Sequence, residues 1–287
     1  MASVKQGLIL AAGRGTRLGD LTENKPKPMV EIGDGLTAID WILKGYSEAG
    51  LESIVIVIGY CGQQLIDYLG AEKYGLKLSY IWQNLDSYGT AAAIQQAKDQ
   101  LENGPFIMSY GDIITSHKNY RNLIDVATNY TNETSNYIDT DEPSNNLDTA
   151  GTSQKTPEVK PGVEPGVMPV LLLNWLEDIS KGGLVKYDIS GEDDKVLEVS
   201  NIIEKPDLDT GGWNSAGVYI LTQDIFNWIQ QIEPSARGEY ELPAAINLML
   251  ESGQKLLAIK QTGFWQDIGV KDDLDVTREF IESEKLI

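Results

Sequence analysis

The chain contains 287 residues, of which 41% are hydrophobic and 23% are charged, and its formal net charge is -20 at pH 7. This composition is typical of a globular protein, and its acidity argues against nucleic acid or an anionic membrane surface as a partner. The single cysteine excludes an internal disulfide, and the single histidine leaves no cluster of soft ligands for zinc, copper or iron. Because no apolar run is long enough to cross a bilayer or has the form of a signal peptide, we expect a cytoplasmic protein.

The first 110 residues alternate between strand and helix patterns. The hydrophobic period predicts strands at residues 8–10, 53–58, 76–82 and 106–110 and helices at 37–49, 63–69 and 90–101. This alternation predicts an α/β fold with a doubly wound, mostly parallel mixed sheet, in which ligands bind at the carboxyl ends of the strands. We expect the residues that follow the strands to line one rim: Gly13, Arg17, Tyr60, Gln83 and Asp112.

The second half adds further strands and helices after a segment of low complexity. Residues 129–167 are rich in Asn, Thr, Ser, Pro and Gly and are interpreted as an insertion on the domain surface. Strands are predicted at 170–173, 183–188, 195–203, 217–221 and 255–260, and helices at 224–232, 243–251 and 272–284. No hexapeptide repeats are present, so we expect one domain over residues 1–287 without a C-terminal β-helix.

A glycine turn and a cluster of cations follow the first strand. Gly13 and Gly15 can take positive φ and leave their N–H groups free for phosphate oxygens. The cluster predicts a small anionic ligand, because the protein as a whole is acidic. A dinucleotide fingerprint would need a third glycine at Leu18, and a P-loop would need Gly-Lys-Ser/Thr in place of Leu18-Gly19-Asp20. The four cations are Arg14, Arg17, Lys25 and Lys27.

The string L-A-A-G-R-G-T-R-L at residues 10–18, followed by P-K-P at 26–28, resembles the signature of the sugar-1-phosphate nucleotidyltransferases. The resemblance implies a Rossmann-like fold with a small sugar-binding β subregion and a site that contains Mg²⁺. In that family the arginine and the lysine bind phosphates, and these roles fall on Arg17 and Lys27. The turn that holds the nucleotide corresponds to Leu10, Ala11, Ala12, Gly13, Gly15 and Thr16.

Two aspartates are candidate metal ligands. Asp112 follows a buried strand, and Asp267 lies in an aromatic segment beyond the last strand. Two carboxylates suit Mg²⁺, which prefers oxygen ligands and keeps several waters. Each aspartate alone is equally well explained as a cap of the next helix. Both match the local context of the metal-binding aspartates of the family.

The resemblance also implies residues for the sugar and for the base. In Glu204-Lys205-Pro206 the lysine would meet the sugar phosphate and the glutamate a sugar hydroxyl, although a strand-terminal surface ion pair is the alternative. Gln83 would read uracil or thymine with its amide, and Gly89 and Thr90 would lie beside the base; an exposed strand-end glutamine is the alternative. Further sugar-binding candidates are Gly183, Asn214, Gly217, Arg237 and Glu241.

The expected reaction joins a sugar-1-phosphate to a nucleoside triphosphate, with UTP or dTTP favoured, and releases pyrophosphate. A single in-line displacement needs no protein nucleophile, so catalysis consists of positioning and charge neutralisation. A cytidylyl- or guanylyltransferase of the same fold and a catalytically silent, sugar-nucleotide-binding regulatory subunit are the alternatives. Dimers and tetramers are common in similar enzymes, and the sequence leaves the sugar and the oligomeric state open.

Overall fold

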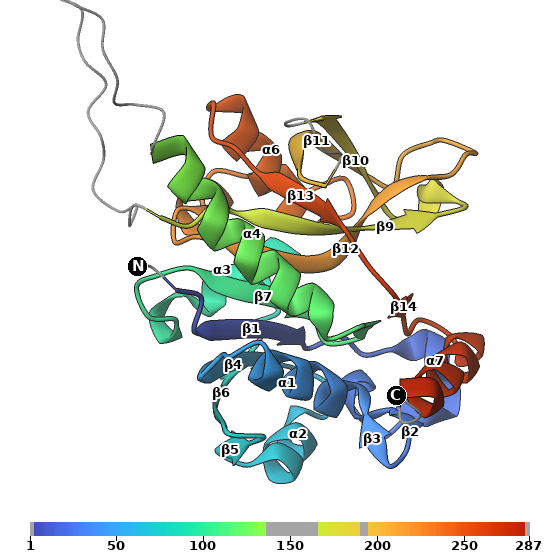
Figure 1. Ribbon diagram of the computed structural model, residues 1–287. Helices are drawn as coiled ribbons and strands as arrows, with labels where there is room; N and C mark the ends of the chain where they lie inside the picture. The colour runs from blue at the N-terminus through green and yellow to red at the C-terminus, as the bar shows by residue number, and fades with distance from the viewer. Residues whose placement is uncertain (1–2, 136–165, 190–194, 285–287) are drawn as a thin grey trace, which may run out of the picture.

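The computed structural model describes residues 3–135, 166–189 and 195–284. Strands from both halves of this part of the chain form one ten-stranded sheet. Its strands are β1 (Gln6–Ala11), β4 (Ser53–Ile58), β5 (Glu72–Lys73), β6 (Leu76–Trp82), β7 (Phe106–Tyr110), β9 (Val170–Leu176), β10 (Gly183–Ile189), β11 (Leu197–Glu204), β12 (Gly212–Leu221) and β13 (Leu257–Lys260). They lie in the order β10-β11-β13-β9-β12-β7-β1-β4-β6-β5 (Figure 1).

The sheet is mixed, and only its N-terminal half is mostly parallel. β1 lies parallel to both β4 and β7, and β4 lies parallel to β6. In the C-terminal half β12 is antiparallel to β7 and β9, and β11 is antiparallel to β10 and β13. The expectation of a mostly parallel sheet therefore fails beyond β7. Strand periodicity shows where a strand lies but not the direction of its neighbour.

Helices cover both faces of the sheet. α1 (Ala38–Glu48), α2 (Gly62–Leu69) and α4 (Lys118–Ser135) pack into one hydrophobic cluster, and α1 and α4 cross the front of the sheet in Figure 1. α3 (Thr90–Gln96), α5 (Ile225–Ile229) and α6 (Leu242–Glu251) pack into a second cluster with the other face. Side chains of α7 (Lys271–Glu284) join a third cluster, which lies under the loop after β1.

Two short ribbons lie outside the large sheet. β2 (Glu31–Gly33) pairs with β3 (Leu36–Thr37), and β8 (Ile113–Thr115) pairs with β14 (Trp265–Asp267). The β2–β3 ribbon leads into α1, which begins with a capping box between Thr37 and Asp40. In this motif each residue's side chain satisfies a backbone N–H of the other, which places the start of the helix. The sequence analysis missed the β8–β14 ribbon, because strands of three residues are too short to show a period.

The expected insertion lies mostly outside the described residues. Its predicted span of about 129–167 overlaps the end of α4, which runs to Ser135, and residues 136–165 are not described. Buried Tyr120, Leu123 and Ala127 hold α4 against the sheet although Asn and Thr, which are weak helix formers, occupy much of its sequence. The predicted helix at 90–101 is also interrupted, because α3 ends at Gln96 and a 3₁₀ helix follows at Lys98–Gln100.

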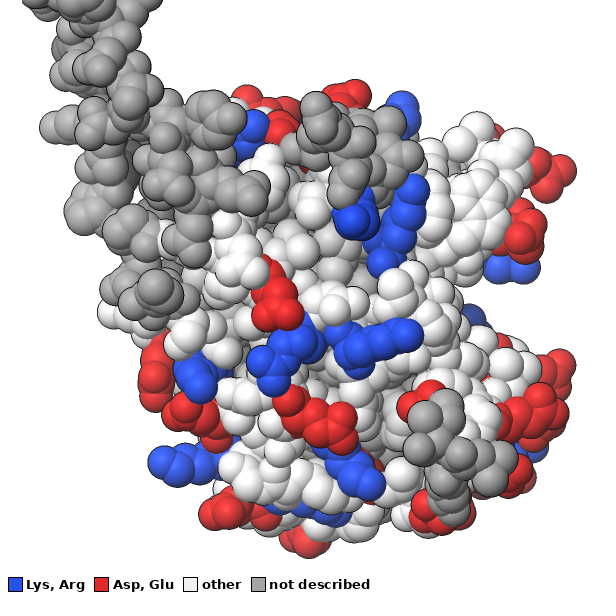
Figure 2. All heavy atoms as spheres, viewed as in Figure 1, with Lys and Arg blue, Asp and Glu red and all other residues white. Residues whose placement is uncertain are grey.

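The described surface carries both signs of charge. On the face in Figure 2, Lys and Arg side chains lie among Asp and Glu side chains. Mixed charge of this kind gives no single-sign field on that face. Within the described residues, no helix has the length and apolar character needed to cross a membrane.

Candidate active site

A cavity of about 1050 Å³ opens at the carboxyl ends of β1 and β7, where the polypeptide leaves the sheet. It extends to β11 and β12 in the C-terminal half, so both halves of the chain contribute to one hollow. Most of the sequence-predicted site residues line it: Leu10, Ala11, Ala12, Gly13, Arg17, Lys27, Gln83, Gly89, Thr90, Asp112, Gly183, Glu204, Lys205, Asn214, Gly217 and Asp267.

Five predicted residues are not among those that line the cavity, namely the site residues Gly15, Thr16, Arg237 and Glu241 and the rim residue Tyr60. Thr16 borders a separate hollow of about 260 Å³, which Tyr60 also lines, so the expectation that Tyr60 stands on the main rim is wrong. Gly15 lies behind Lys27. Arg237 lies behind Glu204, with its Nη2 3.6 Å from Glu204 Oε1 and 2.7 Å from Glu241 Oε1.

The two glycines of the turn after β1 differ in conformation. Gly15 has φ of +65°, and a Cβ there would stand 3.0 Å from Lys27 Cβ, so this glycine makes room for the lysine stem. Gly13 lies outside the left-handed region, so it does not use the positive φ that glycine allows. A Cβ on Gly13 would meet nothing within 4 Å. Since Gly13 lines the cavity, its missing side chain leaves open space there.

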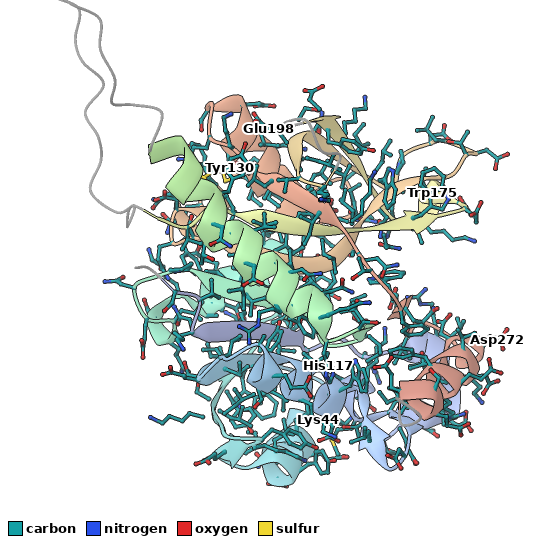
Figure 3. The ribbon with its side chains drawn as sticks, in the orientation of Figure 1. Lys44, His117, Tyr130, Trp175, Glu198 and Asp272 are labelled. Carbon is teal, nitrogen blue, oxygen red and sulfur yellow. The ribbon has the colours of Figure 1, made fainter. Side chains whose placement is uncertain are left out.

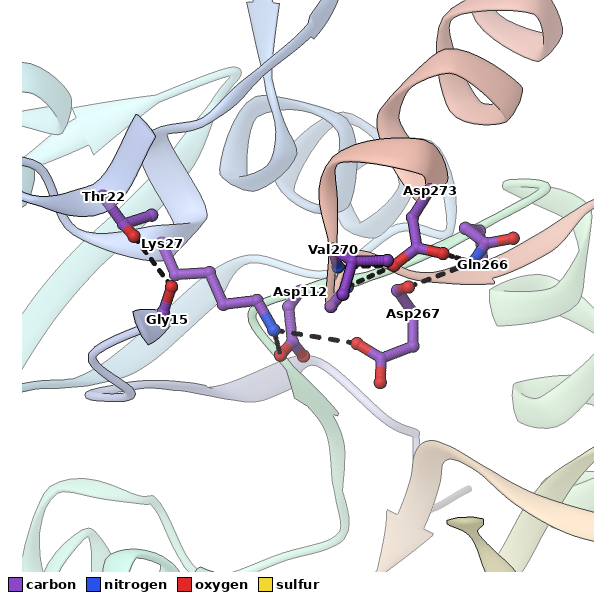
Figure 4. Close-up of polar contacts among 9 residues, drawn as sticks. Gly15, Thr22, Lys27, Asp112, Gln266, Asp267, Val270 and Asp273 are labelled. Carbon is purple, nitrogen blue, oxygen red and sulfur yellow. Dashed lines mark hydrogen bonds and ion pairs between the residues drawn. The ribbon is translucent and has the colours of Figure 1, made fainter. Parts of the chain in front are cut away.

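Lys27 lies between two carboxylates. It begins a 3₁₀ helix, Lys27–Met29, whose entry is set by Pro26, and it is only 9% exposed. Its ammonium donates a hydrogen bond to Asp112 Oδ2 and lies 3.7 Å from Asp267 Oδ1 (Figure 4). The segment Pro26-Lys27-Pro28 therefore places the buried ammonium of Lys27 between Asp112 and Asp267, the two predicted metal ligands.

The β8–β14 ribbon brings the two aspartates together. Asp267, the last residue of β14, lies opposite Ile113 of β8, directly after Asp112. The carbonyl of Asp112 accepts a hydrogen bond from the N–H of Ile268 at 3.0 Å. Backbone pairing between distant segments thus fixes the separation of the two carboxylates, and local sequence cannot reveal such pairing.

The electrostatic environment of Asp267 favours a cation. Burial and the nearby charge of Asp112 raise the pKa of Asp267 to about 6, and Lys27 and Arg17 oppose this rise only in part. The side chain is 46% exposed overall, yet its Oδ1 atom is enclosed and accepts no hydrogen bond in the described part of the chain. An enclosed carboxylate oxygen without a hydrogen-bond donor is a position where a metal ion or a further cation is stabilising.

The residues present fit a hard divalent cation. The described residues hold no cluster of three or more His, Cys, Asp or Glu side chains that could hold a metal ion. Asp112 and Asp267 supply two carboxylates, and Mg²⁺ is commonly held by one or two carboxylates together with waters and substrate phosphates. The arrangement therefore suits a metal that arrives with a phosphate ligand better than one bound by protein alone.

The part of the cavity to which the resemblance assigns the sugar, called the sugar side below, is formed where β11 ends. Lys205 has φ of +45°, a strained backbone conformation for a residue with a side chain, and its N–H donates to the carbonyl of Gly182 at 2.8 Å. Asn214 Oδ1 in turn accepts the N–H of Gly183 at 2.7 Å. The Asn214 amide also donates to Asn174 Oδ1 and to the Ser215 carbonyl, both at 2.8 Å. Both polar atoms of the Asn214 side chain are therefore hydrogen-bonded, Oδ1 to the glycine turn and Nδ2 to β9 and β12.

The sugar side is rich in carboxylates. Burial raises the pKa of Glu204, the negative charge of Glu241 adds to this effect, and Lys205 and Arg237 oppose it. Glu239 also lines the cavity and lies 4.0 Å from Arg237 Nη2. One guanidinium thus holds three glutamates near the position that the resemblance assigns to the sugar.

In the part of the cavity to which the resemblance assigns the base, called the base side below, two segments meet at Gly89. A Cβ on Gly89, whose φ is +128°, would stand 2.5 Å from Tyr240 N and closer still to Tyr240 O. The Tyr240 N–H donates to the carbonyl of Tyr88 at 2.8 Å, and the Tyr240 carbonyl accepts from the Ala91 N–H at 2.9 Å. The backbone of Tyr240 thus leaves no room for a side chain at position 89. This is a second reason for glycine there, besides the expected approach of a base. Gln83 leaves β6 at the same side of the cavity.

The sequence analysis missed several side chains that line the cavity. Trp265 Nε1 donates to the carbonyl of Ala216 at 2.9 Å and so joins the metal-side ribbon to β12. Asp273 stands at the third position of α7, where an acidic residue often belongs to a capping motif, and this signal could have identified it. The aromatic residues could not be identified from the sequence, because aromatic side chains in a strand or loop pattern occur in the hydrophobic core as often as in a cavity wall. The missed residues are Tyr88, Tyr110, Tyr219, Trp265, Gln266 and Asp273.

Comparison with known proteins gives consistent matches over nearly the whole chain. A sequence model of the family described as nucleotidyl transferase matches residues 6–146 and 166–284. UTP–glucose-1-phosphate uridylyltransferase AglF of Haloferax volcanii is 30% identical over 279 residues, which are 97% of this chain and 97% of that protein. The bifunctional protein GlmU of Methanococcus maripaludis is 31% identical over 264 residues. This match covers 91% of the chain but only 51% of GlmU, so the chain spans about half of that relative.

Solved structures share the fold. A UDP-glucose pyrophosphorylase complexed with UDP-glucose aligns with a TM-score of 0.75 at 20% identity, over 98% of this chain and 99% of that one. The UTP-bound UGPase from Acinetobacter baumannii aligns with a TM-score of 0.74 at 17% identity, over 98% and 94% of the two chains. Both are similar in architecture to the α/β structure described above.

Proposed function

Since this chain belongs to the nucleotidyl transferase family, we propose that it transfers a uridylyl or thymidylyl group to a sugar-1-phosphate in the cavity described above. The predicted resemblance to the sugar-1-phosphate nucleotidyltransferases is confirmed by the family match and by the relative AglF. The choice of base, the sugar and the residue roles are the parts that we propose. The observation that supports the transfer reaction and the residue roles in it is the meeting of Lys27, Asp112 and Asp267 within one cavity.

In the proposed reaction a phosphate oxygen of the sugar-1-phosphate attacks the α-phosphorus of the nucleotide, and pyrophosphate leaves. The attacking oxygen is already ionised at pH 7, so the protein needs to supply no general base. Lys205, at the sugar end of the cavity, would anchor the incoming phosphate. Arg17 and Lys27, at the opposite end, would hold the leaving pyrophosphate. Fixed cations at both ends would orient the two phosphates in line and stabilise the charge of the transition state.

Asp112 and Asp267 would hold the metal ion, for which we propose Mg²⁺. When bound there, the ion neutralises phosphate charge in the transition state. The chain contributes the two carboxylates and holds them near each other through the β8–β14 ribbon. The Lys27 ammonium, which contacts both carboxylates, is the group that would turn to the nucleotide phosphates when the metal is present.

Gln83 supports a preference for uracil or thymine. Its side-chain amide has both a donor and an acceptor, and it lines the cavity near Gly89 and Thr90. The relative AglF is named for UTP and glucose-1-phosphate, which makes that pair the first to test. CTP and GTP are the competing nucleotides, and their use would contradict the role of Gln83.

Pyrophosphate release measured for four nucleoside triphosphates against a set of sugar-1-phosphates tests the proposal. We expect turnover with UTP or dTTP, a loss of about 100-fold or more in Asp112→Asn, and a raised KM for the sugar-1-phosphate in Lys205→Ala. Asp272→Asn is the matched control, because Asp272 is exposed and does not line the cavity. Near-normal turnover in Asp112→Asn would remove the metal assignment, and no turnover with any pair would favour a regulatory subunit.

A further inference from the structure

Asp273 closes the turn that carries Asp267. Its Oδ2 atom accepts hydrogen bonds from the N–H groups of Gly269 and Val270, both at 2.7 Å, and its Oδ1 atom accepts from Gln266 Nε2 at 2.9 Å. Gln266 Nε2 also donates to the carbonyl of Asp267 at 3.0 Å (Figure 4). One carboxylate therefore gathers three donors from both sides of Asp267.

The same turn also supports Arg17. A Cβ on Gly269 would stand 3.3 Å from Arg17 Nη2, so the guanidinium lies directly against the backbone of this glycine. The Gly269 N–H donates both to the carbonyl of Asp267 at 3.0 Å and to Asp273. If the turn lost these hydrogen bonds, the Asp267 carboxylate and the Gly269 backbone that contacts Arg17 would shift together.

The carboxylate of Asp267 depends on this support more than a hydrogen-bonded aspartate would. Its Oδ1 atom accepts no hydrogen bond in the described residues, and its ion pair with Lys27 spans 3.7 Å, so no hydrogen bond to that atom fixes its position. Its place is set by the backbone of β14 on one side and by the turn to α7 on the other. A group that holds a ligand in place typically contributes about 10–100-fold to metal affinity or activity.

We propose that Asp273 is a positioning residue for the metal-binding carboxylate of Asp267 and for Arg17, in addition to capping α7. This inference rests on the proposed function. Asp273 lines the cavity but accepts all of its hydrogen bonds from the protein itself. An ionised carboxylate offers only acceptors, whereas an asparagine would turn an NH₂ group toward one of the three donors. The three donors therefore require a carboxylate at this position, and an amide of similar size does not replace it.

The simpler explanation is a helix cap alone. Asp273 is the third residue of α7, and its bond to the Val270 N–H is half of a capping box. Two variants separate the two roles. Gln266→Ala removes the third bond of Asp273 while the bonds to Gly269 and Val270 remain, so the helix cap is preserved. Asp272→Asn removes one charge from the same turn of α7 at an exposed position, which Figure 3 labels.

The test measures metal binding directly in full-length protein. Mn²⁺ binding is followed by electron paramagnetic resonance in the presence of a non-hydrolysable UTP analogue, and kcat and KM are measured against Mg²⁺ concentration. We expect Asp273→Asn to bind Mn²⁺ about tenfold more weakly, to need correspondingly more Mg²⁺, and to regain much of its rate at saturating Mg²⁺. Gln266→Ala should change in the same direction by a smaller factor, and Asp272→Asn should match the wild type.

Specific results would overturn the inference. Equal Mn²⁺ affinity in Asp273→Asn and Asp272→Asn would show that Asp273 caps the helix and does nothing more. If Asp273→Asn fails to fold, wild-type Mn²⁺ affinity in Gln266→Ala would count against the proposal in the same way. Failure of the proposed function is distinguishable, because it would appear as absent turnover in the wild type while Mn²⁺ binding could still be compared among the variants.

Discussion

Replacing Gly89 with alanine should destabilise the protein, because it separates the two segments that meet at the base side of the cavity. The new Cβ would stand 2.5 Å from Tyr240 N, a separation that real Cβ atoms essentially never show, in a backbone with φ of +128°. Such a conformation costs about 1–3 kcal/mol in a residue with a side chain. Moving Tyr240 away would also break its hydrogen bonds to Tyr88 and Ala91, each worth about 0.5–1.5 kcal/mol.

The expected loss is therefore about 2–6 kcal/mol of the free energy of unfolding. At roughly 2 °C per kcal/mol for a chain of this size, the melting temperature should fall by about 4–12 °C. Gly13→Ala is the matched control, because its Cβ would meet nothing within 4 Å and its φ is not positive. Gly13→Ala should melt within about 1 °C of the wild type but bind UTP about tenfold more weakly, since the new methyl enters the cavity.

Differential scanning fluorimetry of both variants, and calorimetric titration of UTP into Gly13→Ala, provide the measurements. If Gly89→Ala melts within 2 °C of the wild type, the contact between Gly89 and Tyr240 does not hold the two segments together. If Gly13→Ala binds UTP as tightly as the wild type, the open space beside Gly13 is not occupied by the nucleotide.

Two further predictions concern the charged groups of the site. The pKa of Asp267 is raised from 3.8 to about 6, so the folded protein binds this proton more tightly than the unfolded chain does. The protonated carboxyl therefore stabilises the fold fully below pH 3.8, and this contribution to the free energy of unfolding is lost as the pH rises through 6. Asp267→Asn cannot ionise, so it should melt at the wild-type temperature near pH 4 and above the wild-type temperature at pH 8, both measured in EDTA. If the two melting temperatures change in parallel between pH 4 and pH 8, the raised pKa of Asp267 is refuted. Lys205→Gly should be more stable than Lys205→Ala by about 1 kcal/mol, because glycine relieves the backbone at φ of +45°. Both Lys205 variants should lose affinity for the sugar-1-phosphate equally in a KM measurement, and equal stability would show that no strain is stored there.

Much of the N-terminal half follows from local chemistry. The β-branched run at 53–58 forms the buried strand β4, and the glycine and cation pattern after β1 lies at the cavity as expected. In both segments the information is contained within a few neighbouring residues, through side-chain period and turn propensity. The same local rules failed for α4, because its Asn- and Thr-rich sequence is helical only when Tyr120 and Leu123 are buried against the sheet.

The sequence by itself determined which chemical groups are available, namely an acidic chain with a few cations gathered around a glycine turn and with aspartates that follow strands. Only the tertiary structure decided which of them meet. Asp112 and Asp267 are joined by a ribbon of three-residue strands, and Gly89 is required by the backbone of Tyr240. Contacts between distant segments depend on strand pairing and packing across the whole sheet, which local residue patterns do not encode.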